Sequence, residues 1–150
     1  MAITCKIGNQ FNEENAKGEH ALVGASLIAI LLDISFGPFD PTTHLKYSDI
    51  SANEIADDST GYTQKTKALA NVSLDQVAGV MTLNADNLTW TASGGAIETC
   101  KACAIINDDH VNDTVICVIE FGANYATADG TSLTINLSNG IVTWTANPVS

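Results

Sequence analysis

The stretch that decides the fold runs from Ile97 to Phe121, with the sequence IETCKACAIINDDHVNDTVICVIEF. Two apolar runs, Ile97 to Ile106 and Val115 to Phe121, flank the acidic segment Asn107 to Asp113. Residues branched at Cβ favour strands, and the segment between the runs is too long for a tight hairpin turn. The sequence therefore predicts two consecutive strands joined by an exposed loop.

Alternation of side chains along a strand sorts these residues onto faces. One face of the first strand is predicted to carry Cys100, Ala102, Ala104 and Ile106, and one face of the second carries Val115, Cys117, Ile119 and Phe121. The same alternation separates the two thiols of the motif Cys100-Lys101-Ala102-Cys103. Zinc needs four ligands and a turn to gather them, so the cysteines are predicted to be free, structural thiols in a reducing cytosol.

Working outward, further apolar runs are separated by Gly, Asn and Asp. The predicted strands are Leu27 to Leu32, Val72 to Val77, Val80 to Leu83, Leu88 to Ala92, Leu133 to Leu137 and Ile141 to Thr145. Many short strands with such turns are typical of a sandwich or barrel. We therefore predict an all-β fold, an antiparallel β-sandwich that is jelly-roll-like.

The dipeptide Asn139-Gly140 is a strong hairpin signal, because both residues tolerate the positive φ of a type I′ turn. It predicts that the last two strands form a hairpin with one apolar face. The expected pairs are Leu137 with Val142, Ile135 with Trp144 and Leu133 with Ala146. Trp90 and Trp144 share strand faces with aliphatic residues, so both are expected in the core rather than exposed for sugar stacking.

The first twenty residues differ from the rest. A short alternating strand, Ile3 to Ile7, precedes the polar run Asn9 to Glu19, which holds the single aromatic Phe11. We predict an extended arm over residues 1–20 and one sandwich domain over residues 21–150. Apolar side chains in a polar arm have little core to join, so Ile3, Ile7 and Phe11 are the predicted protein-interface anchors.

The segment from Gly37 to Thr66 contains Pro38 and Pro41, repeated Asp, Ser and Thr, and few apolar residues. Connections of this length in compact domains are usually functional or ordered by a partner. It is therefore predicted to be a mostly irregular connection that can clamp a neighbouring subunit.

Charge narrows the choice of partners. Six lysines, no arginine and seventeen acidic residues give a formal charge of -11. Such a chain repels polyphosphate and lacks bidentate guanidinium contacts, so no nucleic-acid partner is expected. The apolar stretch Ala21 to Ile34 is interrupted and falls short of the roughly 20 residues that span a bilayer, and no secretory signal is visible. We expect a soluble protein with no membrane partner.

The sequence contains few of the motifs that indicate a catalytic site or a metal-binding site. The three histidines, His20, His44 and His110, lie in predicted loops, and neither a nucleophile elbow nor a glycine-rich phosphate loop is present. The acidic loop around Asp109 lacks the Gly and bidentate Glu of an EF-hand. The sequence therefore predicts no enzyme, no catalytic residue, no metal site and no cofactor.

Seven short segments, taken in order, carry a resemblance. They are Leu31-Leu32-Asp33, Tyr47-Ser48-Asp49-Ile50, Gly61-Tyr62-Thr63, Ala68-Leu69-Ala70-Asn71-Val72, Leu83 to Ala92, Ala104 to Asp109 and Ile119-Glu120-Phe121-Gly122. In this order, over about residues 27 to 146, the chain resembles small β-rich virion structural proteins of tailed bacteriophages, of the capsid decoration or cement type. It departs from that pattern at Gln64-Lys65-Thr66, where a glycine-rich turn is expected, and in its cysteines.

The resemblance implies a subunit that binds the outer capsid surface and stabilises the head. Its implied partners are the major capsid protein and copies of itself, often as a trimer, and its implied location is the virion, assembled in the host cytoplasm. Two alternatives stay open: a tail or head–tail joining subunit of the phage, and a carbohydrate-binding β-sandwich module.

Overall fold

The computed structural model describes residues 4–137 and 139–145, and most of its regular structure is β strand. The N-terminal elements are β1 (Thr4–Ile7), α1 (Asn9–Ala16), β2 (Leu27–Asp33), α2 (Tyr47–Ile50), a 3₁₀ turn (Ser51–Asn53) and β3 (Lys67–Ala68). They are followed by β4 (Ser73–Val77), β5 (Val80–Asn84), β6 (Leu88–Thr91), β7 (Ile97–Asn107), β8 (Thr114–Thr127), β9 (Ser132–Ile135) and β10 (Val142–Thr145). Every strand predicted within these residues is present.

The long strands β7 and β8 form the centre of the molecule, as the sequence predicts. They pair antiparallel inside a five-stranded sheet with the order β1-β8-β7-β2-β3. Strand β2 is buried along nearly its whole length, because both faces of this sheet are covered. A strand covered on both sides is expected to be a continuous apolar run rather than an alternating one, which explains the sequence of Leu27 to Leu32.

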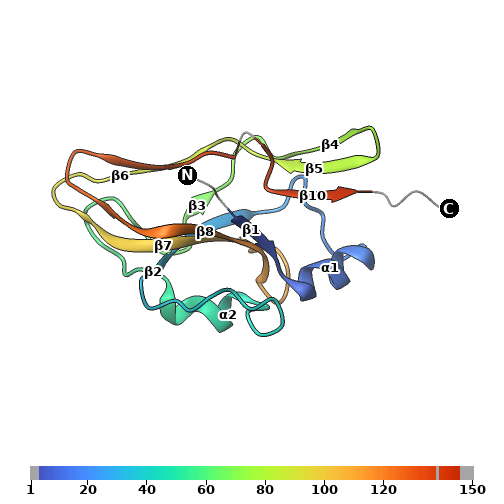
Figure 1. The fold of residues 1–150 in the computed structure, drawn as a ribbon, viewed down its shortest axis with the longest axis horizontal. Coiled ribbons are helices and arrows are strands. Elements are labelled where there is room, and N and C mark those ends of the chain that lie inside the picture. The colour runs from blue at the N-terminus through green and yellow to red at the C-terminus, as the bar shows by residue number, and fades with distance from the viewer. Residues whose placement is uncertain (1–3, 138, 146–150) are drawn as a thin grey trace.

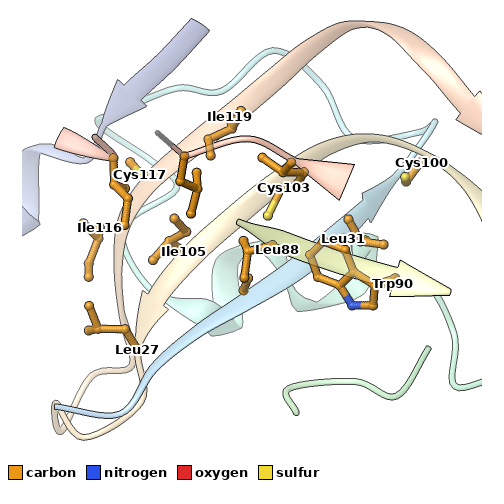
Figure 2. Packing of buried hydrophobic residues seen from close by; sticks show 14 of the residues in the cluster. Leu27, Leu31, Leu88, Trp90, Cys100, Cys103, Ile105, Ile116, Cys117 and Ile119 are labelled. Atoms are coloured by element: carbon orange, nitrogen blue, oxygen red, sulfur yellow. The ribbon is translucent and has the colours of Figure 1, made fainter. Parts of the chain in front are cut away.

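Two smaller sheets cover one face of the large sheet, and the segment containing α2 covers the other (Figure 1). The small sheets have the orders β10-β5-β4 and β6-β9. The main core lies between the large sheet and the small sheets and includes Leu31, Trp90, Cys103, Ile105 and Cys117 (Figure 2). The antiparallel sandwich is thus confirmed, whereas a jelly-roll connectivity is not confirmed by these strand orders.

Irregular pairing between β7 and β8 changes which side chains share a face. The register shifts between Cys100 and Ala102, and such a bulge adds a residue that offsets the alternation. Cys100 and Cys103 therefore both face the main core, while Ala102 faces the α2 side with Ala104 and Ile106. The prediction that the two thiols point to opposite faces is wrong for this reason.

A second correction concerns the end of the chain. β9 and β10 do not pair with each other: β9 pairs with β6, placing Leu133 opposite Trp90, and β10 pairs with β5, placing Val142 opposite Leu83. Gly140 does adopt a positive φ of 86°. The turn therefore passes the chain from one small sheet to the other, because partners elsewhere in the chain complete both strands. The proposed partner Ala146 lies outside the described residues.

The predicted N-terminal arm belongs to the folded body. β1 pairs with β8, and Phe11 on α1 is 0% exposed in the main core. Gly8 joins the two elements where a Cβ would lie 2.7 Å from the carbonyl oxygen of Val115, so only glycine fits without movement. The premise that these side chains lack a core is wrong for Phe11 and for half-buried Ile7, and Ile3 lies outside the described residues.

The connection from Gly37 to Thr66 also packs on its own sheet. Ile50 faces a second core with Phe39, while Ile55 and Tyr62 reach the main core. Buried Glu54 accepts hydrogen bonds from the hydroxyls of Tyr47 and Tyr62, both at 2.6 Å. Much of this connection is therefore ordered by the chain itself and needs no partner to order it.

Candidate functional site

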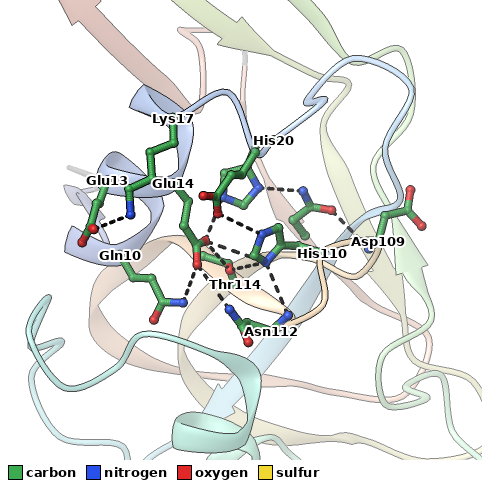
Figure 3. Close-up of polar contacts among 11 residues, drawn as sticks. Gln10, Glu13, Glu14, Lys17, His20, Asp109, His110, Asn112 and Thr114 are labelled. Atoms are coloured by element: carbon green, nitrogen blue, oxygen red, sulfur yellow. Dashed lines mark hydrogen bonds and ion pairs between the residues drawn. The ribbon is translucent and has the colours of Figure 1, made fainter.

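A buried polar cluster lies between α1 and the loop that joins β7 to β8. Its centre is Glu14, and it is called here the Glu14 cluster (Figure 3). The members besides Glu14 are Gln10, His20, Asn107, His110, Asn112 and Thr114. The ligand-type atoms of Glu14, His20 and His110 all lie within 4.8 Å of one another.

Helix geometry explains how the first half of the cluster forms. Glu14 lies three residues after Phe11, so both project from the inward side of α1. The helix ends in a Schellman motif: Gly18, with φ 76°, donates to Asn15 O, and the Glu19 amide donates to Glu14 O. This turn reverses the chain, and His20 then reaches Glu14, with its ring centroid 5.0 Å from that of Phe11 and the two rings tilted by 48°.

Glu14 receives a hydrogen bond at nearly every oxygen lone pair. Gln10 and Asn112 donate to Oε1 at 2.6 and 3.3 Å, and Thr114 Oγ1 donates to Oε2 at 2.7 Å. Burial alone raises the pKa of a carboxyl group, but these donors and nearby His110 outweigh it and hold the pKa of Glu14 below its usual value. Glu14 is therefore an anion held in place.

The protonation of His20 follows from its neighbours. Asn107 accepts from the Asp109 amide through Oδ1 at 3.1 Å, so its Nδ2 donates to His20 Nδ1 at 2.9 Å. His20 Nε2 then carries the proton and donates to Glu14 Oε2 at 3.0 Å. Burial, followed by the proximity of His110, lowers the pKa of His20, so the ring is neutral.

His110 faces two carboxylates. Its Nδ1 lies 2.9 Å from Thr114 Oγ1 and 3.8 Å from Glu14 Oε2, and its Nε2 lies 3.8 Å from Glu19 Oε2. The Asn112 backbone amide also points at His110 Nδ1, at 3.4 Å, so this nitrogen has two hydrogen-bond partners, Thr114 Oγ1 and the Asn112 amide. A cleft of about 300 Å³ opens beside this ring, and Glu19, Asn107 and His110 line part of it.

A second candidate site is a surface. The β4–β5 hairpin exposes Leu74, Val77 and Met81, with exposed fractions of 39%, 72% and 42%. Leu74 and Met81 share one face of the hairpin and are called the hairpin patch, whereas Val77 points to the other face. Within the described residues, β4 pairs with β5 alone, so its outer edge is free. Exposed apolar groups beside an unpaired strand edge are typical of contact sites for other chains.

The residues considered for other chemistry have structural positions. Trp90 is 4% exposed, which confirms its place in the core, and Trp144 is half-buried against the same core. In the acidic loop, Lys65 pairs with Asp108 at 2.6 Å and with Asp113 at 3.2 Å. These two carboxylates are therefore held by a lysine, which the prediction of a simply solvated acidic loop did not include.

Cys5 is expected to be the first thiol modified in the native protein. Its side chain is half-buried and its pKa is lowered by a hydrogen bond with Cys117, whereas burial raises the pKa of Cys100 to about 11 and raises that of Cys103 further. Thiolates are the reactive form. Alkylation with iodoacetamide near pH 8 should add one group at Cys5, and unfolded protein should gain four. Fast native labelling of Cys103 would contradict this packing.

Sequence reasoning missed the Glu14 cluster. The sequence places His20 and His110 in predicted loops, and Glu14 is one of several acidic residues in the predicted arm. The nearest sequence signal is the placement of Phe11 and Glu14 on one side of a helix, three residues apart, with His20 after the helix-ending Gly18. Nothing local connects these residues to His110, which lies 90 positions further along.

No helix among the described residues combines the length and the apolar character needed to cross a membrane. Comparisons of the chain with protein-family models, with curated proteins and with solved structures gave no match.

Proposed function

We propose that this chain is a bacteriophage virion structural protein, a capsid decoration subunit that binds the outer capsid surface and stabilises the head. The observation that carries the proposal is the hairpin patch on a free strand edge. The seven segments that resemble small virion proteins in the same order along the chain indicate which partner to expect. That partner is the major capsid protein, together with copies of this chain.

The geometry of the hairpin suits a protein partner. Leu74 lies opposite Leu83 and Gln76 lies opposite Met81, so Leu74 and Met81 share the face that further inward buries Leu83. On this face Trp144 lies opposite Met81 and packs 6.1 Å from the Phe11 ring of α1, while Leu74 and Met81 stay 39% and 42% exposed. The free backbone groups of β4 can pair with a strand of another chain, while Leu74 and Met81 enter its apolar contacts.

Charge and burial weigh against the other partner classes. A formal charge of -11 without arginine disfavours packaged DNA as a neighbour and favours an outward position. A sugar-binding module needs an exposed aromatic platform, yet Trp90 lies in the core. Recognition through a protein surface remains the best-supported activity.

The direct test is a measurement of the chain in purified phage particles. Quantitative mass spectrometry should find it in an amount comparable to the major capsid protein, and labelled chain should appear over the head in electron micrographs. A far smaller amount, located at the neck or tail, would replace the decoration role by the tail or head–tail joining role. Absence from particles would overturn the proposal.

The hairpin patch is tested with a matched pair of variants. Leu74→Ser combined with Met81→Ser should lower binding to particles that lack the chain by at least about tenfold, because each apolar side chain loses contact area. Val111→Ser changes another exposed apolar side chain, which lies in the β7–β8 loop, and should bind normally. Circular dichroism would establish that both variants are folded. Equal binding by the two would move the contact away from the hairpin.

A further inference from the structure

We propose that Glu14, His20 and His110 form a binding site for a divalent transition metal, with Zn²⁺ the best-suited ion. Two imidazoles and one carboxylate are ligands that zinc commonly takes from proteins. The three side chains come from α1, from the turn after it and from the β7–β8 loop, and their side chains are at most 9% exposed. The site is independent of the hairpin patch.

The distances suit a small ion after minor adjustment. Zinc bonds to nitrogen and oxygen are about 2.0–2.2 Å long, which places neighbouring ligand atoms of a tetrahedron roughly 3.3–3.6 Å apart. Glu14 Oε2 lies 3.0 Å from His20 Nε2 and 3.8 Å from His110 Nδ1. One separation is shorter and one is longer than this value, and the three ligand atoms all lie within 4.8 Å of one another, so rotations of the imidazole side chains bring them onto one ion.

Groups around the three ligands already hold them. Gln10 and Asn112 fix the second oxygen of Glu14, and Phe11 packs against the His20 ring. Glu19 Oε2 lies 3.8 Å from His110 Nε2, where it can accept the proton of a metal-bound imidazole, as carboxylates often do around zinc. A fourth ligand, such as water, can reach the ion from the cleft beside His110.

Metal binding requires a rearrangement of protons that balances. In the metal-free protein His20 carries its proton on Nε2, where it donates to Glu14, and His110 Nδ1 faces both Thr114 Oγ1 and the Asn112 amide. When His20 Nε2 and His110 Nδ1 bind the ion, the proton of His20 moves to Nδ1, and any proton on His110 Nδ1 is released to solvent, which leaves that ring with a proton on Nε2 only. His110 Nε2–H then faces Glu19, but His20 Nδ1–H faces the Asn107 amide group that now donates to it.

The Asn107 amide is therefore expected to lower the affinity of the site for metal, because it points a donor at the protonated Nδ1 of His20. A substitution of Asn107 tests this. Asn107→Asp replaces the donating amide by a carboxylate, which accepts both from His20 Nδ1–H and from the Asp109 amide. Because outer partners of zinc-bound histidines change metal affinity by about 10–100-fold, this variant should bind Zn²⁺ at least about tenfold more tightly than the unmodified chain.

The experiment uses the full chain, freed of metal with a chelator and then desalted. Competition with a chromophoric zinc chelator should show one Zn²⁺ per chain, and Co²⁺ should give the intense visible absorption of four-coordinate cobalt. His110→Gln should weaken Zn²⁺ binding by at least about 100-fold and abolish that absorption, since it removes one of three protein ligands. His44→Gln is the matched control, because His44 lies outside the cluster and contacts Asp40.

Each result of these titrations either supports the zinc site or overturns it. Tighter binding by Asn107→Asp, normal binding by His44→Gln and loss in His110→Gln support the site. Lack of one-to-one binding by the unmodified chain, or equal affinity of the two histidine variants, would overturn it. Far-ultraviolet circular dichroism identifies a variant that is unfolded, and Asn107→Asp then still decides through its gain in affinity.

Discussion

Replacing Phe11 with alanine is expected to lower the free energy of unfolding by about 3–5 kcal/mol, the usual cost of removing a buried aromatic ring. Phe11 is fully buried, and its ring lies 5.0 Å from that of His20 and 6.1 Å from that of Trp144. Its loss leaves a cavity between α1 and β10 that rigid strands cannot fill. Urea denaturation followed by tryptophan fluorescence measures the change.

The control for this substitution is Ile34→Ala, which shortens an apolar side chain that is 55% exposed. Surface changes of this kind usually alter stability by less than about 0.5 kcal/mol. A loss below about 1 kcal/mol for Phe11→Ala would mean that α1 contributes little to the fold, as an independent arm would. That result would restore the interpretation that residues 1–20 exist to contact a partner.

Replacing Glu54 with alanine is expected to cost about 3–5 kcal/mol, because it leaves several buried neutral donors without an acceptor, each at a cost of about 1–3 kcal/mol. Glu54 accepts from Tyr47, from Tyr62 and from the Lys65 amide, at 2.6, 2.6 and 2.9 Å. Tyr62 also accepts from the Leu31 amide in β2 at 3.0 Å. Without the carboxylate, buried donors lose their acceptor and the connection loosens from the sheet.

The matched control is Glu98→Ala. Glu98 is exposed and accepts one long hydrogen bond, 3.3 Å from the Ala56 amide. Its removal should change the urea midpoint little, since exposed polar contacts contribute roughly 0–1 kcal/mol. Hydrogen exchange should locate the loss in Glu54→Ala at Tyr47 and Tyr62 and their neighbours. Equal stability of the two variants would show that the connection is held by its apolar residues alone.

Local pattern located the strands because strand formation depends on residue type and alternation over a few positions. The apolar runs Ile97 to Ile106 and Val115 to Phe121 became β7 and β8, and Leu27 to Leu32 became β2. The pairing of the last strands was wrong because a turn signal measures only local preference. β9 and β10 each have an equally apolar partner far away in sequence, in β6 and β5.

The cysteines show a second limit of local pattern. Strict alternation separates Cys100 from Cys103, but a register shift against β8 brings both into the main core. A bulge arises from the fit between two strands, so one strand's sequence does not reveal it. The Glu14 cluster has the same origin, since His110 joins Glu14 only after the β7–β8 loop meets α1.

The sequence by itself determined the β class, the positions of the strands and the acidic, arginine-free character of the surface. These properties depend on side-chain chemistry and on spacing along the chain. Only the tertiary structure decided that α1 belongs to the core, that Glu54 secures the long connection, and that Glu14, His20 and His110 meet. Each of these depends on contacts between segments that are distant in sequence. Such contacts form, and stabilise the protein, only when the sheets have packed together.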